Sequence, residues 1–197
     1  MPNQPKTRRR PTREETRARL LEAAASVFSE RGFEAASLDD VATEAGLTKG
    51  AIYSSFSSKE DLFFEVLEAR TQQRLASARL VVGDAGPAAA GHALGERLAA
   101  FTADDPMWHL AFLEFWAASV RGQRENAEEL RERRREFRDE IAGELVRAGV
   151  DEHADQLAVL ILALSNGLAV ERAIDAESAD GVFAFALERL VQRAPRE

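Results

Sequence analysis

Apolar residues recur at spacings of three and four along almost the whole chain, and this repeat limits the folds that the chain can form. Side chains three and four positions apart return to the same face of an α-helix. No segment alternates apolar with polar residues as a half-buried strand does, and no hairpin turn is visible. The pattern therefore predicts an all-α fold of about nine helices. The chain contains no cysteine, so packing alone must stabilise it.

The length of 197 residues suits a small head joined to a larger helical body. Hydrophobic residues make up 45% and charged residues 30% of the chain, a balance typical of globular proteins. The longest apolar run, 157–170, is closed by Glu171 and Arg172 and is too short for a membrane span. The N-terminus also lacks the pattern of a secretory signal. We therefore expect a soluble, cytoplasmic protein with no membrane partner.

Charge is distributed unevenly, and its distribution is more informative than the net charge of −8. Residues 1–80 contain 13 basic and 12 acidic residues, whereas residues 81–197 contain 13 and 22. The less acidic N-terminal part of such a chain could bind phosphate, whereas its acidic body would repel nucleic acid. Residues 1–11, rich in proline and arginine, are expected to form a disordered basic arm. This arm either contacts phosphates or a minor groove, or is only a solubilising tail.

Helix start and stop signals predict a three-helix head. The first helix is expected to end before Gly32, because glycine accepts the left-handed conformation that ends helices. Ser37 is placed to cap a second short helix and Thr48 a third, with Gly46 in the tight turn between them. Two short helices joined in this way are the signature of a helix-turn-helix. The sequence thus predicts a DNA-binding head over residues 12–58.

A helical body is expected over residues 59–197. Its first helix, 59–80, begins at a capping sequence and connects the head to the body. The stretch 82–91 is rich in glycine, alanine and proline and is predicted to be a loop. The later helices are predicted from the residues that would cap them, which are Asp105 followed by Pro106, Asn126, Asp151 and Ser178.

One long segment of the chain carries an in-register family pattern. Its residues are Gly32-Phe33, Ser37-Leu38, Val41-Ala42, the run from Ala45 to Ile52 and Tyr53, then Phe56, Lys59-Glu60 and Leu62. This pattern closely resembles the DNA-binding signature of the TetR/AcrR family of regulators and covers roughly residues 17–66. The resemblance implies phosphate contacts by Tyr53 and Lys59. One position departs from the pattern, because the family often carries His or Tyr where this chain has Ser55.

The third predicted helix has the side chains that a recognition helix requires. Its exposed face needs short or polar residues if its N-terminal end is to enter the major groove. Gly50 permits close approach, Ala51 suits a thymine methyl group, and Lys49 can reach guanine or phosphate. The predicted DNA-binding residues are Ser37, Thr48, Lys49, Gly50, Ala51, Tyr53, Ser54, Ser55 and Lys59. The alternative is that Tyr53 only packs and Lys59 is only solvated.

The helix expected after Asp105 is apolar nearly all round and should be central and buried. Its aromatic residues fall within one arc, which forms either a pocket wall for a flat or greasy effector or ordinary core. The candidate ligand-binding residues are Phe101, Trp108, Phe112, Phe115, Trp116 and, on a later helix, Asn166. Glu114 projects from another side and either pairs with a cationic ligand or finds arginine or solvent.

The last two predicted helices carry long apolar faces. Packed against a two-fold copy, such faces would form a four-helix dimer interface. The alternative is that one of the faces belongs to the internal core. The candidate interface residues are Leu157, Ile161, Leu164, Leu168, Phe183, Leu187 and Leu190.

These features together predict a homodimeric DNA-binding regulator, most directly a repressor that a small-molecule effector releases from a palindromic operator. An activator of the same family, or a ligand-binding protein with a vestigial head, are the alternatives. No phosphate loop, nucleophile elbow or carboxylate cluster is visible. The three histidines lack metal-ligand spacing. We therefore expect no enzymatic activity, no cofactor and no metal site.

Overall fold

A computed structural model describes residues 12–81, 87–122, 127–150 and 152–192, and these residues form helices and no strand. The predicted all-α fold is thereby confirmed. The helices are α1 (Arg13–Ala35), α2 (Leu38–Glu44), α3 (Lys49–Tyr53), α4 (Lys59–Val81), α5 (Pro87–Asp104), α6 (Pro106–Val120), α7 (Ala127–Arg147), α8 (Ala154–Ile174) and α9 (Val182–Gln192). The predicted features that lie outside the described residues are the basic arm 1–11 and the caps Asn126 and Asp151.

The head helices begin where their local sequence predicts, but α1 does not end before Gly32. Thr12 and Ser37 each form a complete capping box with the acidic residue three positions later. Gly46 has a φ angle of 61°, in the left-handed region that ends a helix, whereas Gly32, with a φ angle of 74°, only kinks α1, which continues to Ala35. Thr48 precedes α3 as expected, although its side chain makes no capping hydrogen bond. Local hydrogen-bonding chemistry therefore sets the layout of the head.

One predicted boundary in the body is wrong. The stretch 82–91 was expected to be a loop, but Pro87 opens α5 and the helix continues from there. Proline fits the first turn of a helix because its fixed φ is helical. It lacks an N–H group, but N–H groups in the first turn form no hydrogen bond within the helix in any case. The start of α6 follows the prediction, with Asp105 as the cap.

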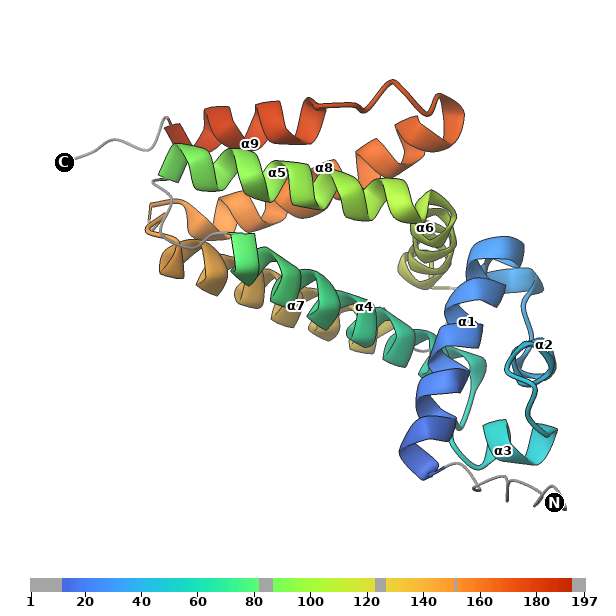
Figure 1. The fold of residues 1–197 in the computed structure, drawn as a ribbon. Helices are drawn as coiled ribbons and strands as arrows, with labels where there is room; N and C mark the ends of the chain where they lie inside the picture. The colour runs from blue at the N-terminus through green and yellow to red at the C-terminus, as the bar shows by residue number, and fades with distance from the viewer. Residues whose placement is uncertain (1–11, 82–86, 123–126, 151, 193–197) are drawn as a thin grey trace, which may run out of the picture.

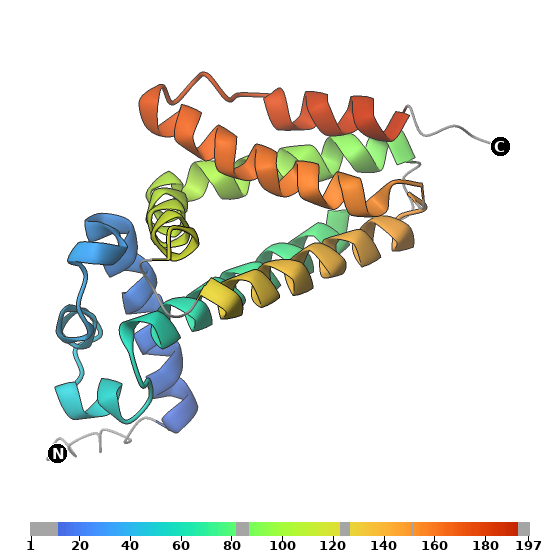
Figure 2. The ribbon, with the colours of Figure 1, turned by 180° about the vertical axis from the view of Figure 1, so that it is seen from behind.

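The head lies at one end of an elongated helical body (Figure 1). α4 leads from the head into the body and runs beside α7, while α5, α8 and α9 form the other side. α6 runs across the other body helices and lies next to α1, as the view from behind also shows (Figure 2). The head therefore contacts the body through two helices, α4 and α6.

Two apolar cores fill the protein, and the first is shared by head and body. Phe28 and Phe33 of α1 and Phe63 of α4 surround the rings of Trp108 and Phe115 on α6. The ring centroids of these pairs lie 4.6 to 6.5 Å apart. The second core joins α5, α7, α8 and α9. The predicted domain boundary after residue 58 is thus crossed by one continuous core.

α8 is longer and more apolar than the run 157–170 suggested. It has 21 residues and a mean hydropathy of 1.7 over its most apolar window, so its length and composition alone would allow it to cross a membrane. A single helix of this kind is a weak sign of a span. Only 28% of that window is buried within the chain. Much of the apolar surface of α8 is therefore uncovered by its own chain.

Candidate nucleic-acid interface and ligand cavity

α3 lies on the outer side of the head, away from the body (Figure 1). Ile52 and Phe56 anchor it, being 0% and 3% exposed. Of the predicted DNA-binding residues, the exposed ones are Ser37, Thr48, Lys49, Gly50, Tyr53 and Ser54. Ala51 and Ser55 are partly buried, and the Ser55 hydroxyl donates to the Ala51 carbonyl at 2.9 Å. A short helix with a polar outer surface and a firmly packed inner side is thus available to a groove.

The two largest side chains of this surface differ in how free they are. The side chain of Tyr53 is 59% exposed, which does not fit the alternative that its ring only packs. The Lys49 ammonium contacts a carboxylate oxygen of Asp39 on α2. That hydrogen bond and the negative charge of Asp39 raise the pKa of Lys49. A DNA contact by Lys49 would therefore require it to exchange Asp39 for a phosphate or a base.

Lys59 has a different place from the one predicted. Its Nζ donates to the carbonyl oxygens of Phe33 at 2.7 Å, Glu34 at 3.1 Å and Ala36 at 3.0 Å. It also lies 4.4 Å from the centroid of the Phe33 ring. An ammonium group has three donors, and these three carbonyls use them. Lys59 is therefore not only solvated but joins the start of α4 to the end of α1, and its phosphate contact stays a prediction.

Glu114 of α6 holds the same turn from the other side. Its two carboxylate oxygens accept hydrogen bonds from the backbone N–H groups of Phe33 at 3.0 Å and Glu34 at 3.3 Å. A Cβ atom on Gly32, whose φ is 74°, would lie 2.7 Å from Glu114 Oε2. Glu114 thus binds backbone, and it forms no ion pair with an arginine among the described residues. The segment that follows the kink at Gly32, at the end of α1, is held by Lys59 of α4 through its carbonyl oxygens and by Glu114 of α6 through its N–H groups.

Asp105 provides a second joint between α6 and the head. Its Oδ2 accepts hydrogen bonds from Ser29 Oγ of α1 at 2.8 Å and from Arg70 Nη2 of α4 at 2.7 Å, while Oδ1 accepts from the N–H of Trp108 at 3.0 Å. Burial opposes ionisation of this carboxyl, but the hydrogen bonds from Trp108, Ser29 and Arg70 outweigh it and lower the pKa of Asp105. A charged Asp105 therefore ties three helices together.

Most of the aromatic residues of α6 belong to the core, although Phe112 also lines a second cavity between α4 and α7. Trp108, Phe112 and Phe115 are buried in the shared core of head and body. Trp116 is 42% exposed. Phe101 is partly buried, with the Arg97 guanidinium 4.9 Å from its ring centroid, and Asn166 is also partly buried. None of the six candidate ligand-binding residues lines the cavity described next, whereas Phe112 and Phe101 each line another cavity, so the predicted ligand site stays a prediction.

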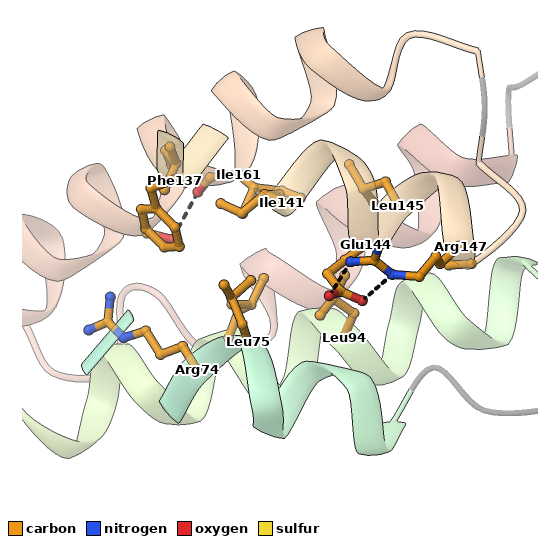
Figure 3. Close-up of a pocket in the computed structure, with 13 residues that line it drawn as sticks. Arg74, Leu75, Leu94, Phe137, Ile141, Glu144, Leu145, Arg147 and Ile161 are labelled. Carbon is orange, nitrogen blue, oxygen red and sulfur yellow. Dashed lines mark hydrogen bonds and ion pairs between the residues drawn. The ribbon is translucent and has the colours of Figure 1, made fainter. Parts of the chain in front are cut away.

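An apolar cavity of about 280 Å³ lies among α4, α5, α7 and α8. Its apolar lining comes from Leu75, Leu94, Leu98, Phe137, Ile141, Leu145, Ile161 and Leu162. Its polar lining comes from Arg74, Glu144, Arg147 and Ser165. Figure 3 shows Arg74 at one end of the lining and the Glu144–Arg147 pair at the other. No local motif points to this cavity, because each of the four helices contributes only a few of its residues.

Arg74 belongs to a short polar chain that ends at α6. Its Nη2 lies 2.9 Å from Nε2 of His109, whose Nδ1 lies 3.2 Å from the carbonyl oxygen of Asp105. A guanidinium can only donate, so Nε2 must accept and Nδ1 must carry the proton of a neutral imidazole. Burial and the positive charge of Arg74 lower the pKa of His109 to about 4, which keeps it neutral. Burial and nearby Arg70 likewise lower the pKa of Arg74 to about 10.

The predicted dimer-interface residues lie mostly inside one chain. Leu157, Ile161, Phe183 and Leu187 are buried in the second core, and Leu164, Leu168 and Leu190 pack against it. The alternative, that this face is internal, is therefore correct. The exposed large apolar residues of α8 and α9 are Val159, Leu160, Ile174, Val182 and Phe185. The faces that the sequence analysis selected on these two helices turn inward, and the dimer interface itself stays a prediction.

Other proteins share both halves of this architecture. Residues 20–66 match the model of bacterial regulatory proteins of the tetR family, and residues 87–193 match the C-terminal domain of BetI-type transcriptional repressors. The chain is 40% identical over 67 residues to the HTH-type transcriptional activator FasR of Mycolicibacterium smegmatis. It is 46% identical over 55 residues to the HTH-type transcriptional regulator AcrR of Shigella flexneri.

These two matches cover 34% and 28% of this chain but only 31% and 26% of the curated relatives, so less than a third of each relative's length is matched. The crystal structure of a transcriptional regulator from Pseudomonas aeruginosa PAO1 shares the fold over nearly the whole length. Its TM-score is 0.71 at 22% identity, with 96% of this chain and 94% of that chain covered.

Proposed function

Because the chain belongs to the TetR family of bacterial regulatory proteins, which are DNA-binding transcriptional regulators, we propose that it is a cytoplasmic repressor released from its operator by a small molecule. The exposed polar surface of α3 is the observation that carries this proposal. The match of residues 87–193 to BetI-type repressors favours repression over activation. We also propose that the protein has no enzymatic activity and that double-stranded DNA and one effector are its partners.

In this proposal the N-terminal end of α3 enters the major groove. Gly50 has room for close approach, since the nearest atom to a Cβ there would be Thr48 Oγ1 at 3.9 Å. Thr48, Lys49 and Ser54 supply donors to bases and phosphates, and the exposed Tyr53 hydroxyl supplies one at the rim. Lys59 is left out of the DNA contacts, because its ammonium already binds three carbonyls.

We propose a homodimer formed by the uncovered apolar faces of α8 and α9. Leu160 and Phe185 are 42% and 64% exposed on these two helices. Packing the pair against a second copy about a two-fold axis would bury both faces in a four-helix interface. The two copies of α3 would then read half-sites about 34 Å apart, one turn of the duplex.

Effector release requires a link between the body and the head, and α4 and α6 both supply one. α4 carries cavity residues Arg74 and Leu75 and, at its start, Lys59. α6 holds the turn after α1 through Glu114 and α1 itself through Asp105. A ligand that favours a different position of either helix would change the spacing of the two recognition helices.

A binding experiment with matched variants tests the DNA-binding surface. Wild-type protein should enrich a palindromic duplex from a random pool, and Tyr53→Ala should weaken binding to that duplex by roughly fivefold or more, the loss expected for a contact of about 1 kcal/mol. Trp116→Ala, which removes an exposed aromatic from α6, should bind as wild type does. Equal affinities of Tyr53→Ala and Trp116→Ala would exclude the proposed surface.

Activation of transcription is the second candidate, favoured by the 40% identity to the activator FasR over 67 residues. Activator and repressor would use the same α3 surface and differ in the effect of bound protein on the promoter. A promoter–reporter measured with and without the regulator distinguishes them, since loss of the regulator raises expression only if it represses.

A further inference from the structure

Two partly buried arginines form no ion pair with a described residue, and one of them lines the apolar cavity while the other lines a second cavity. Arg74 of α4 hydrogen-bonds through Nη2 to the neutral ring of His109, and no carboxylate within the described chain forms an ion pair with it. Arg134 of α7 faces the ring of Phe112 at 5.7 Å from its centroid, likewise with no ion pair to a described residue. The nearby carboxylate of Asp105 acts on Arg74 through space but is bound by Arg70. A charge held away from water without a direct ion pair is costly, so these two sites favour an incoming anion.

The remaining charges of the cavity lining are already paired. Arg147 donates to both carboxylate oxygens of Glu144, through Nε at 3.1 Å and through a second, shorter contact from Nη2. These two charges cancel, which leaves Arg74 as the unbalanced charge of the lining. The cavity thus offers a long apolar wall and one excess positive charge at the end near α6 (Figure 3).

We propose that the effector of this protein is a small amphipathic anion whose apolar body fills the cavity and whose carboxylate- or phosphate-like head binds Arg74. This inference rests on the proposed function, because it names the class of ligand that would release the repressor. A planar guanidinium binds such a head through two parallel hydrogen bonds. The volume of about 280 Å³ is at the small end of ligand pockets, so the apolar body must be compact or short.

The same contact gives the ligand a route to the head. The anionic head competes with His109 for the guanidinium of Arg74, and His109 in turn touches the carbonyl of Asp105. Asp105 holds Ser29 of α1 and Arg70 of α4. A ligand in the cavity therefore acts on the contacts between α6 and the head by moving the guanidinium of Arg74 away from His109.

Three probes with the same ten-carbon chain test the ligand class: decanoate, 1-decanol and decyltrimethylammonium, each used below its aggregation concentration. Calorimetric titration of the full-length protein should show decanoate binding at one site per chain. 1-Decanol should bind at least tenfold more weakly, and the cationic probe more weakly still. Tighter binding of decyltrimethylammonium than of decanoate would overturn the proposal.

Variants at the two ends of the cavity test the assignment of the head. Arg74→Gln should weaken decanoate binding tenfold or more and leave 1-decanol unchanged, because only the charge contact is lost. Arg147→Gln, at the other end of the same lining, is the matched control and should change decanoate affinity by less than twofold. An unchanged decanoate affinity in Arg74→Gln would exclude Arg74 as the anion site. If Arg74→Gln does not fold, the order of the three probes on wild-type protein still decides the ligand class.

The DNA readout separates this inference from the proposed function. If the protein binds its selected duplex but decanoate neither binds nor releases it, the ligand class is wrong and the regulator stands. If decanoate binds through Arg74 while no duplex is bound, the DNA-binding function is wrong and the anion site stands.

Discussion

At the scale of single residues, the charged groups at the centre of the molecule act mainly on backbone and on each other. Lys59 and Glu114 bind opposite sides of one turn, and Asp105 binds groups from α1, α4 and α6. Next to them, burial and the positive charge of Arg74, which donates to its ring, lower the pKa of His109 and keep it neutral. Protonation of His109 would place a second positive charge against that arginine. The stability of the interior is therefore sensitive to the protonation of His109.

Acidification should destabilise the protein through His109. Its pKa in the folded protein is about 4, below the 6.5 of an unperturbed histidine, so the unfolded chain takes up the proton first. The contribution of His109 to stability is complete above pH 6.5 and is lost as the pH falls toward 4. Between pH 7 and pH 5 this loss amounts to about 2 kcal/mol of unfolding free energy.

Urea unfolding of the wild type and of His109→Gln at pH 7 and pH 5 measures this contribution. Glutamine cannot take up a proton, so the variant should lose about 2 kcal/mol less than the wild type over the same interval. The exposed His153 offers a control, since His153→Gln should retain the pH dependence of the wild type. Identical pH dependence in wild type and His109→Gln would contradict the prediction.

At the scale of secondary-structure elements, the close contact of α5 with α9 depends on one glycine. A Cβ atom on Gly95 would lie 2.4 Å from the Cα of Ala184 and 2.9 Å from the carbonyl oxygen of Phe183. Backbone atoms of α9 cannot give way as a flexible side chain would. Gly95 therefore sets the distance between these two helices.

Gly95→Ala should lower the free energy of unfolding by about 1 to 3 kcal/mol, because α9 must move away from α5 to admit the methyl group. Gly143→Ala is the matched control on α7, where a Cβ would meet its nearest neighbour, Arg147 Nη1, at an ordinary 3.7 Å. That control should stabilise the protein by up to about 1 kcal/mol, since alanine is the better helix former. Urea denaturation of both variants measures the difference, and equal stability of Gly95→Ala and wild type would be the opposing result.

The elements also show how far the sequence could be interpreted. The head was predictable because caps and helix-ending glycines act over three or four residues, as Ser37 and Gly46 do. The start of α5 at Pro87 was not, because the same residue types also form loops. The helical period showed that α8 is apolar, but not which of its faces turns inward. The cavity was missed because its lining converges from four helices and is set by tertiary packing.

At the scale of the whole molecule, the exposed apolar side chains of α8 and α9 form the surface that the proposed dimer would bury. Leu160 of α8 and Phe185 of α9 are 42% and 64% exposed, and both helices pack against α5. Large exposed apolar side chains favour association. The proposed dimer covers this surface and accounts for a helix that has the composition of a membrane span.

Phe185→Glu should convert the protein to a monomer, because a carboxylate at the centre of the proposed interface would be buried without a partner. Val146→Glu, a change at a 47% exposed position of α7, should leave the dimer intact. Light scattering coupled to size-exclusion chromatography gives the mass of each variant. A wild type that is monomeric at micromolar concentration, or a dimeric Phe185→Glu, would rule out this interface.

The aromatic core shared by head and body limits how such regulators can recombine. A chimera cut after residue 58, between the helix-turn-helix and α4, would separate Phe28 and Phe33 from the Trp108 and Phe115 rings they pack against. A helix-turn-helix from another protein, joined to this body at that junction, would place a foreign α1 against an α6 whose aromatic residues do not match it. Exchange of sensor modules, in evolution or in the laboratory, should succeed only when α6 is inherited together with the head, or when its aromatic positions are rebuilt to match.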